Sequence, residues 1–121
     1  MTNKKTLVLG ASANPARYSY LALKKLNAND HTVVAIGKRK TKVDNIEIDT
    51  EQKAIEDLDT VTLYLNAGNQ KQYYDYILSL HPKRIIFNPG AENDELAALA
   101  SKNGIKTMEA CTFVLLSTHQ N

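Results

Sequence analysis

The chain has 121 residues, of which 43% are hydrophobic and 23% are charged, and its formal net charge is +2. These values predict a single domain spanning residues 1–121. So small a net charge argues against nucleic acid and against a membrane surface as partners, and no apolar run approaches the roughly 20 residues that cross a bilayer. The only cysteine, Cys111, excludes an internal disulfide. This single cysteine, together with the lack of a recognisable signal peptide in the sequence, predicts a cytoplasmic protein.

Five short apolar runs predict the strands of a parallel sheet that is buried on both faces. They are residues 6–11, 32–37, 60–65, 84–88 and 105–109. The last run is shorter and more polar than the others, which places it nearer an edge of the sheet. Residues 38–49 are charged and irregular, with one short extended piece expected at 45–48.

Apolar residues at helical spacing account for most of the segments between these strands. The predicted helices cover residues 15–27, 51–58, 70–80, 94–102 and 111–116. Asn14 is the expected cap of the first helix and Pro15 its first residue, because a proline has no N–H to leave unsatisfied there. Asn69 is the expected cap of the third helix, with Gln72 three residues further on.

Strands that alternate with helices predict an α/β fold of the Rossmann type, with a doubly wound five-stranded parallel sheet in the order 3-2-1-4-5. Ligands of such sheets bind beyond the carboxyl ends of the strands, at the switch point of the topology. We expect that point between the first and fourth strands. The rule selects five loops, residues 10–17, 37–40, 66–69, 88–93 and 109–112.

The loop after the first strand has part of the chemistry of a phosphate-binding turn. Read as G-x-G-x-x-G from Gly10, it has Ser12 and Pro15 in place of the second and third glycines, and the dinucleotide fingerprint therefore fails. Gly10 still permits a tight turn, the small residues after it allow close approach, and the next helix offers free N–H groups. Ser12 adds a hydroxyl and Arg17 a positive charge. The alternative is a capped turn that binds no ligand.

The loop after the second strand discriminates between nucleotides. An NAD site in this fold has an acidic residue there, which binds the ribose hydroxyls. This chain has Gly37, Lys38, Arg39 and Lys40 instead. Three cations attract a ribose phosphate, which disfavours NAD and leaves NADP and coenzyme A (CoA) as candidates. The alternative is a solvated basic loop without a ligand.

Four blocks of sequence, in order along nearly the whole chain, resemble the small single-domain CoA-binding proteins of bacteria. They are Gly10–Ser19, Leu63–Asn66, Pro82–Asn93 and Glu109–Thr112. These proteins are similar to the nucleotide-binding domain of the succinyl-CoA synthetase alpha chain. The resemblance implies a Rossmann-type fold with CoA in the crevice at the strand ends. The synthetase domain that carries the phosphorylated histidine has no counterpart in this sequence, and ligase activity is therefore not implied.

The resemblance also implies roles for individual residues. The first turn would contact the CoA phosphates, and the loop after the second strand would meet the ribose phosphate or adenine. The end of the third strand would border the adenosine or pyrophosphate, and the end of the fourth would border the pantetheine. The residues are, in that order, Gly10, Ala11, Ser12, Asn14, Pro15, Arg17 and Tyr18; Gly37 and Lys38; Asn66 and Ala67; and Asn88, Pro89 and Gly90. On this interpretation the chain is a non-catalytic carrier, sensor or regulatory module for CoA or an acyl-CoA.

A second hypothesis is an enzyme of the same fold, either an NADP-linked reductase whose partner completes the site or a thioester enzyme that uses Cys111 and Glu109. The alternative for Cys111 is a small buried apolar group. A third hypothesis is a protein that acts by binding other proteins and whose nucleotide site is vestigial. The sequence also leaves open that the chain forms a homo-oligomer or binds a protein partner. We expect no metal site, because His31, His81 and His119 lack metal-ligand spacing.

Overall fold

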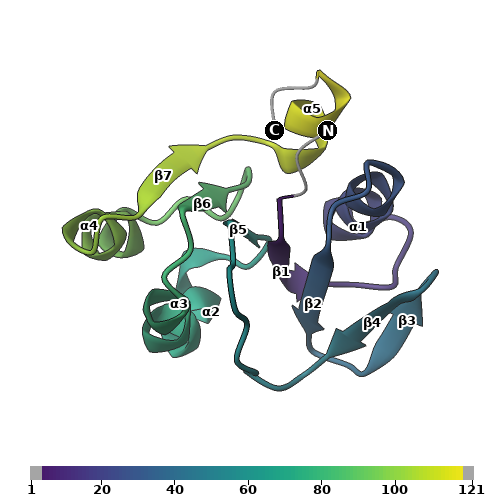
Figure 1. The fold of residues 1–121 in the computed structure, drawn as a ribbon, viewed down its shortest axis with the longest axis horizontal. Coiled ribbons are helices and arrows are strands. Elements are labelled where there is room, and N and C mark those ends of the chain that lie inside the picture. Colours follow the sequence, from purple (N-terminus) through teal and green to yellow (C-terminus); the bar gives the residue numbers. More distant parts are fainter. Residues whose placement is uncertain (1–3, 119–121) are drawn as a thin grey trace.

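The strands of the computed structural model, which describes residues 4–118, form one mixed, mostly parallel sheet (Figure 1). They are β1 (Thr6–Ala11), β2 (Val33–Gly37), β3 (Thr41–Val43), β4 (Ile46–Asp49), β5 (Thr60–Leu63), β6 (Arg84–Phe87) and β7 (Lys106–Glu109). Their order across the sheet is β3-β4-β2-β1-β5-β6-β7, and the β3–β4 pair is antiparallel. All five predicted strands are present, and the predicted Rossmann-like α/β class is confirmed.

Helices cover both faces of the sheet, as in a doubly wound fold. They are α1 (Tyr18–Ala28), α2 (Ala67–Gln70), the 3-10 helix η1 (Lys71–Tyr73), α3 (Tyr74–Leu80), α4 (Asp94–Lys102) and α5 (Thr112–Ser117). α1 and α5 lie together over one face, while α3 and α4 lie over the other (Figure 1). A hydrophobic cluster lies on each face of the sheet, and alternate residues of β1 belong to one or the other. Leu7 and Leu9 pack on the side of α3 and α4, and Val8 packs on the side of α1. Within residues 4–118, no helix is long and apolar enough to span a membrane.

The predicted strand order, 3-2-1-4-5, is wrong for the five strands recognised in the sequence. Strand β5 pairs with β1, on the side opposite β2, whereas the prediction places it beyond β2. The position beyond β2 belongs to β4, which pairs with β2 in parallel. The sheet therefore has seven strands instead of five, and its switch point falls between β1 and β5.

The segment expected to be largely irregular forms a β-hairpin beside β2. Strands β3 and β4 pair through a two-residue turn at Asp44 and Asn45, where Asp44 has a φ of 53°. The apolar side chains of the hairpin pack against α1. The same helix contacts the turn, since Lys24 lies 3.4 Å from the Asp44 carboxylate and Asn27 donates a hydrogen bond to the side chain of Asn45. The extended piece predicted at 45–48 is confirmed as β4.

Residues 51–58 form no helix, contrary to the prediction. They lead from one half of the sheet to the other, and side chains from distant segments satisfy two of their carbonyl groups. The hydroxyl of Tyr76 donates to the Lys53 oxygen at 2.6 Å, and Nζ of Lys5 donates to the Glu56 oxygen at 2.7 Å. Tertiary hydrogen bonds thus take the place of the helical ones.

His31 holds the amino-terminal end of β1 in place only while it is neutral. Its Nδ1 accepts a hydrogen bond from the backbone N–H of Lys4 at 2.9 Å, and the residue is 9% exposed. Burial, reinforced by the charge of Lys4, lowers the pKa of His31. The unfolded chain therefore binds this proton at a higher pH than the folded chain. The free energy of unfolding should then fall as the pH drops below about 6.5.

This pH dependence can be measured in thermal unfolding. We expect the Tm of the wild type to fall more steeply than that of His31→Asn between about pH 7.5 and about pH 5.5. The asparagine oxygen can still accept from Lys4 but does not titrate in this range. Equal slopes for the two proteins would contradict the role given to His31.

Candidate functional site

The candidate site lies at the carboxyl edge of the sheet, where four neighbouring strand ends follow one another in the order β2-β1-β5-β6. Ala11 at the end of β1 pairs with Gly37 at the end of β2, and the first turn and the basic loop therefore leave the sheet from adjacent positions. On its other side β1 pairs with β5, which leads to Asn66. The observed order thus brings Asn66 beside the first turn and places Asn88, after β6, one strand further along.

Two glycines among the predicted site residues lie where neighbouring strands come so close that a side chain would not fit. Gly10 has a φ of 87° and lies where the register of β1 shifts; a Cβ there would lie 3.0 Å from the backbone carbon of Tyr64. At Gly37 a Cβ would lie only 2.3 Å from the backbone oxygen of Ala11. The contacts of β1 with β5 and β2 therefore determine where the first turn begins.

The first turn is closed by hydrogen bonds among its own residues. Oγ of Ser12 accepts from the N–H of Asn14, and Oδ1 of Asn14 accepts from the N–H of Ala16, both at 3.0 Å. The backbone oxygen of Asn14 accepts from the N–H of Arg17, also at 3.0 Å. Asn14 therefore shapes the turn and does not cap the helix, contrary to the prediction.

Helix α1 begins at Tyr18, later than predicted, and Pro15 lies in the turn before it. No side chain caps this helix at Arg17. Within the part of the chain that the structure describes, the N–H groups of Tyr18 and Ser19 have no hydrogen-bond acceptor. Because Tyr18 is exposed and Ser19 is buried, the helix presents the free N–H of Tyr18 and the positive end of its dipole at the end of the first turn.

Exposed positive charges lie directly before this helix and on the neighbouring loop after β2. Arg17 precedes α1, and Lys38, Arg39 and Lys40 follow β2. None of the four forms a salt bridge within residues 4–118. Their charges are therefore available to an anion from solution.

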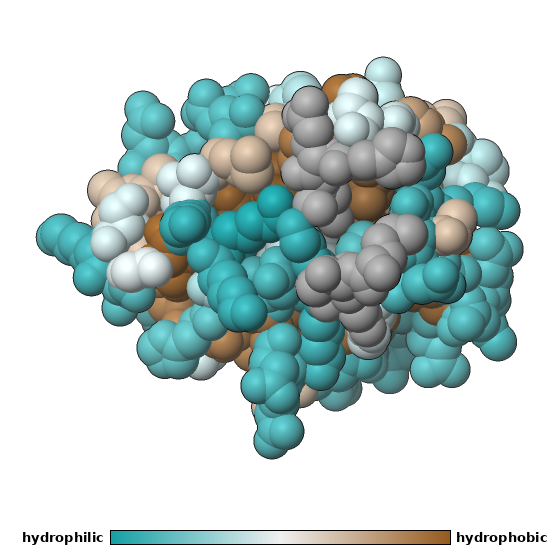
Figure 2. Space-filling view, turned by 45° about the horizontal axis from the view of Figure 1, so that its top comes forward, coloured by the Kyte–Doolittle hydropathy of each residue, from teal (hydrophilic) through white to brown (hydrophobic). Residues whose placement is uncertain are grey.

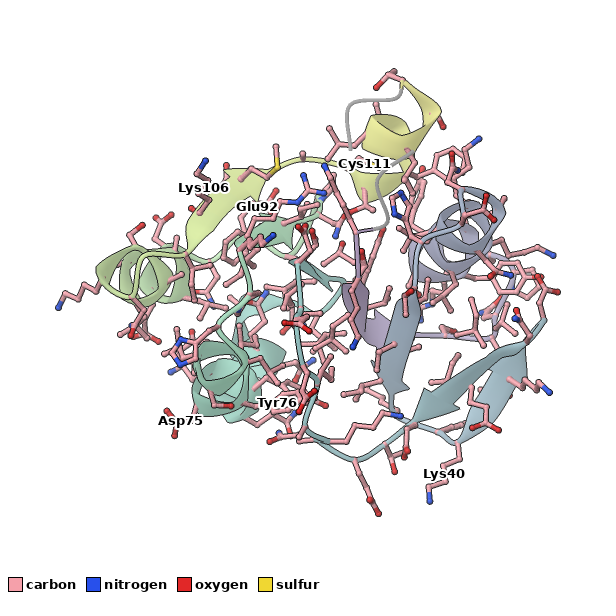
Figure 3. The ribbon with its side chains drawn as sticks, viewed as in Figure 1. Lys40, Asp75, Tyr76, Glu92, Lys106 and Cys111 are labelled. Atoms are coloured by element: carbon pink, nitrogen blue, oxygen red, sulfur yellow. The ribbon has the colours of Figure 1, made fainter. Side chains whose placement is uncertain are left out.

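A shallow hollow of about 300 Å³ lies on the hairpin, and the basic loop contributes Lys40 to it. The other residues that line it are Thr41, Lys42, Glu47, Ile48 and Asp49. The backbone N–H groups of Thr50 and Glu51 lower the pKa of Asp49. Lys40 extends outward from the start of the hairpin (Figure 3). Because the hollow mixes both signs of charge, it is a poorer place for a phosphate than the first turn.

Asn66 and Ala67 follow β5 at the start of the next helix. Oδ1 of Asn66 accepts a hydrogen bond from the N–H of Asn69 at 2.9 Å, and Asn66 is therefore the cap of α2. The prediction that Asn69 is the cap is wrong, because the chain turns into the helix directly after the strand. Asn66 is exposed and Ala67 half-buried.

Asn88, which follows β6, is 1% exposed. Its Nδ2 donates to Oγ1 of Thr62 at 2.7 Å and to the Leu63 oxygen at 2.8 Å, while its Oδ1 accepts from the N–H of Thr112 at 2.8 Å. The side chain thus joins β5, β6 and the start of α5. At this strand end, exposed groups come instead from residues 89–90.

Sequence reasoning missed two other buried amides, Gln70 and Asn93, which lie between the loops after β5 and β6. Asn93 caps α4, since its Oδ1 accepts from the N–H of Leu96 at 3.1 Å. Its position before the predicted helix at 94–102 was a signal that could have identified it. No sequence signal marks Gln70, because glutamines are mostly exposed in proteins.

The residues of the alternative enzyme hypothesis lie at the next strand end. Glu109 ends β7 and is exposed, while half-buried Cys111 lies between β7 and α5 (Figure 3). Nearby, burial raises the pKa of Tyr64 to about 12. Its hydroxyl has no hydrogen-bond partner among the described residues.

Within these residues no group of three or more His, Cys, Asp or Glu side chains could hold a metal ion; His119 lies outside them.

Hydrophilic side chains predominate on the face seen in Figure 2, and hydrophobic ones lie in small separate areas. The large exposed hydrophobic side chains of the described chain are Tyr18, Leu21, Met108 and Val114. Tyr18 is the most exposed of them, at 67%. Because it is the first residue of α1, its aromatic ring is available beside the first turn.

Comparison with known proteins gives a family and several similar structures. A family model described as "CoA binding domain" matches residues 4–117. The crystal structure of an uncharacterized protein is 47% identical, with a TM-score of 0.96 and 100% of each chain covered. A hypothetical protein from Pyrococcus horikoshii OT3 shares the fold at 18% identity and a TM-score of 0.86, over 96% of this chain and 83% of the other. A protein from Thermus thermophilus also shares the fold, at 18% identity and a TM-score of 0.86, over 98% of this chain and 91% of the other. None of the curated proteins matches this chain.

Proposed function

Because this chain belongs to the CoA-binding domain family, we propose that it binds coenzyme A or an acyl-CoA as a non-catalytic carrier, sensor or regulatory module. The observation that carries the proposal is the pairing of Ala11 with Gly37. Because of this pairing, the first turn, which leads to an uncapped helix start, leaves the sheet beside an exposed basic loop. A ligand with a diphosphate and a separate ribose phosphate matches both.

The diphosphate would lie at the first turn. The free N–H group of exposed Tyr18 suits its oxygens, and Arg17 adds a charge that can form strong hydrogen bonds to phosphate. Oγ of Ser12 accepts from the N–H of Asn14, which leaves its own O–H free to donate. The turn thus combines backbone, hydroxyl and guanidinium donors.

The ribose phosphate would lie at Lys38 and Arg39, and the exposed ring of Tyr18 offers a face for the adenine. NADP also carries a ribose phosphate and would suit the same loop. The family favours CoA, and the line of strand ends from β1 through β5 to β6 offers an extended path for the pantetheine. Exposed residues 89–90 lie along that path, and exposed Asn66 lies between them and the first turn, where the pyrophosphate would pass into the pantetheine.

Calorimetric titration with CoA, NADP and NAD tests the proposal. We expect CoA to bind about tenfold or more tightly than NADP, and NAD to bind weakest. Arg17→Ala should weaken CoA binding by about tenfold or more, since a hydrogen bond to a charged group is lost. A clear response to NADP with none to CoA would overturn the proposal. Hydrolysis of acetyl-CoA that disappears in Cys111→Ser would instead favour the thioester enzyme.

A further inference from the structure

Gln70 is the last residue of α2 and has no exposed surface. A buried glutamine needs partners for two N–H donors and for its carbonyl oxygen. From the partners that it has, we infer that Gln70 positions the half of the CoA site formed by the loops after β5 and β6. This inference rests on the proposed function and identifies a residue that acts without contacting the ligand.

The amide nitrogen of Gln70 joins the two loops directly. Nε2 donates to the backbone oxygen of Leu65, just after β5, at 2.7 Å. It also donates to the backbone oxygen of Ala91, after β6, at 2.7 Å. Both donors are therefore used, one for each loop. The side chain sets the separation of two backbone segments that no strand pairing holds at this point.

The carbonyl oxygen of Gln70 continues the network. Oε1 accepts from Nδ2 of Asn93 at 2.9 Å, and the same nitrogen donates to the Tyr74 hydroxyl at 2.8 Å. Oδ1 of Asn93 caps α4 through the N–H of Leu96. Both amide side chains thus have all their N–H donors satisfied, and a fully satisfied buried network of this kind rigidifies its surroundings.

The two halves of the site are held by different contacts. The first turn depends on the hydrogen bonds of Asn14 and on the close packing at Gly37 and Gly10, and none of the hydrogen bonds of Gln70 reaches those three residues. The loops that Gln70 joins lead to residues 89–90, which border the proposed pantetheine path, and to Asn66, which lies where the pyrophosphate would pass into that path. A change at Gln70 should therefore act on the pantetheine half of CoA and leave the adenosine bisphosphate half unaffected.

Affinities for CoA and for adenosine 3′,5′-bisphosphate, measured by calorimetry well below the unfolding temperature, test this division. Gln70→Met keeps an unbranched side chain of similar size but leaves the Leu65 and Ala91 oxygens without their donor. We expect it to weaken CoA binding about tenfold and to leave bisphosphate binding within about twofold. The matched control is Tyr76→Phe (Figure 3), which removes a partly buried hydrogen bond from α3 to the Lys53 oxygen, a group that belongs to neither loop. It should leave both affinities unchanged.

An equal loss of affinity for both ligands in Gln70→Met, or an unchanged affinity for CoA, would overturn the inference. If Gln70→Met does not fold, Asn93→Asp replaces it, because the aspartate keeps the oxygen that caps α4 but lacks the donor to Gln70. The same selective loss of CoA affinity is expected of that variant, and its absence would again overturn the inference. If the wild type binds neither ligand, the proposed function itself is wrong.

Discussion

The Gly37→Ala variant should be less stable than the wild type by about 3 kcal/mol, which lowers Tm by about 10 °C. The added Cβ would lie 2.3 Å from the backbone oxygen of Ala11. That oxygen belongs to a neighbouring strand and cannot rotate away as a side chain would. The ends of β1 and β2 must therefore separate, which also disturbs the start of the first turn.

Gly68→Ala is the matched control for this substitution. Gly68 lies in α2, and a Cβ there would meet only Oδ1 of Asn66, at 3.5 Å. Because alanine favours helix over glycine by up to about 1 kcal/mol, this variant should be as stable as the wild type or slightly more so. Thermal unfolding followed by circular dichroism compares the three proteins. Equal Tm values for Gly37→Ala and the wild type would refute the packing argument.

The double variant Lys38→Ala/Arg39→Ala should bind CoA at least about tenfold more weakly than the wild type, because hydrogen bonds from charged groups contribute about 1.5–3 kcal/mol each. Its affinity for dephospho-CoA, which lacks the ribose phosphate, should change much less. The difference between the two ligands isolates the contact between basic loop and ribose phosphate. Calorimetric titration of both proteins with both ligands provides the four affinities.

A control with the same change in net charge is Lys102→Ala/Lys106→Ala. Both lysines are exposed, on α4 and β7, and Lys106 lies far from Lys40 at the start of the hairpin (Figure 3). This variant should bind both ligands as the wild type does at about 0.15 M salt, where distant charges are screened. An equal loss of CoA affinity in both double variants would show that overall charge, and not the basic loop, is responsible.

Short-range patterns predicted most of the elements correctly. The apolar runs that became β1, β2, β5 and β6, and the helix at 94–102, follow from burial and spacing that local sequence reveals. Strand β7, whose residues are mostly exposed, lies at an edge of the sheet, as its shorter and more polar run predicts. Errors appeared where other segments supply the hydrogen bonds. Residues 51–58 are an example, since Tyr76 and Lys5 satisfy their carbonyls. A different error lies at the start of α1, where Asn14 closes a local turn with Ala16 in place of capping the helix.

The sequence alone determined the chemistry of this protein's candidate site: the small residues of the first turn with Arg17, and the cations after β2. Only the tertiary structure decided which strand ends lie together, because strand order depends on pairings between segments far apart in the chain. It placed β5 beside β1, and so Asn66 beside the first turn. It also turned the side chain of Asn88 inward and buried Gln70 between two loops. The roles of Asn88 and Gln70 depend on hydrogen-bond partners far away in the sequence, which no local pattern reveals.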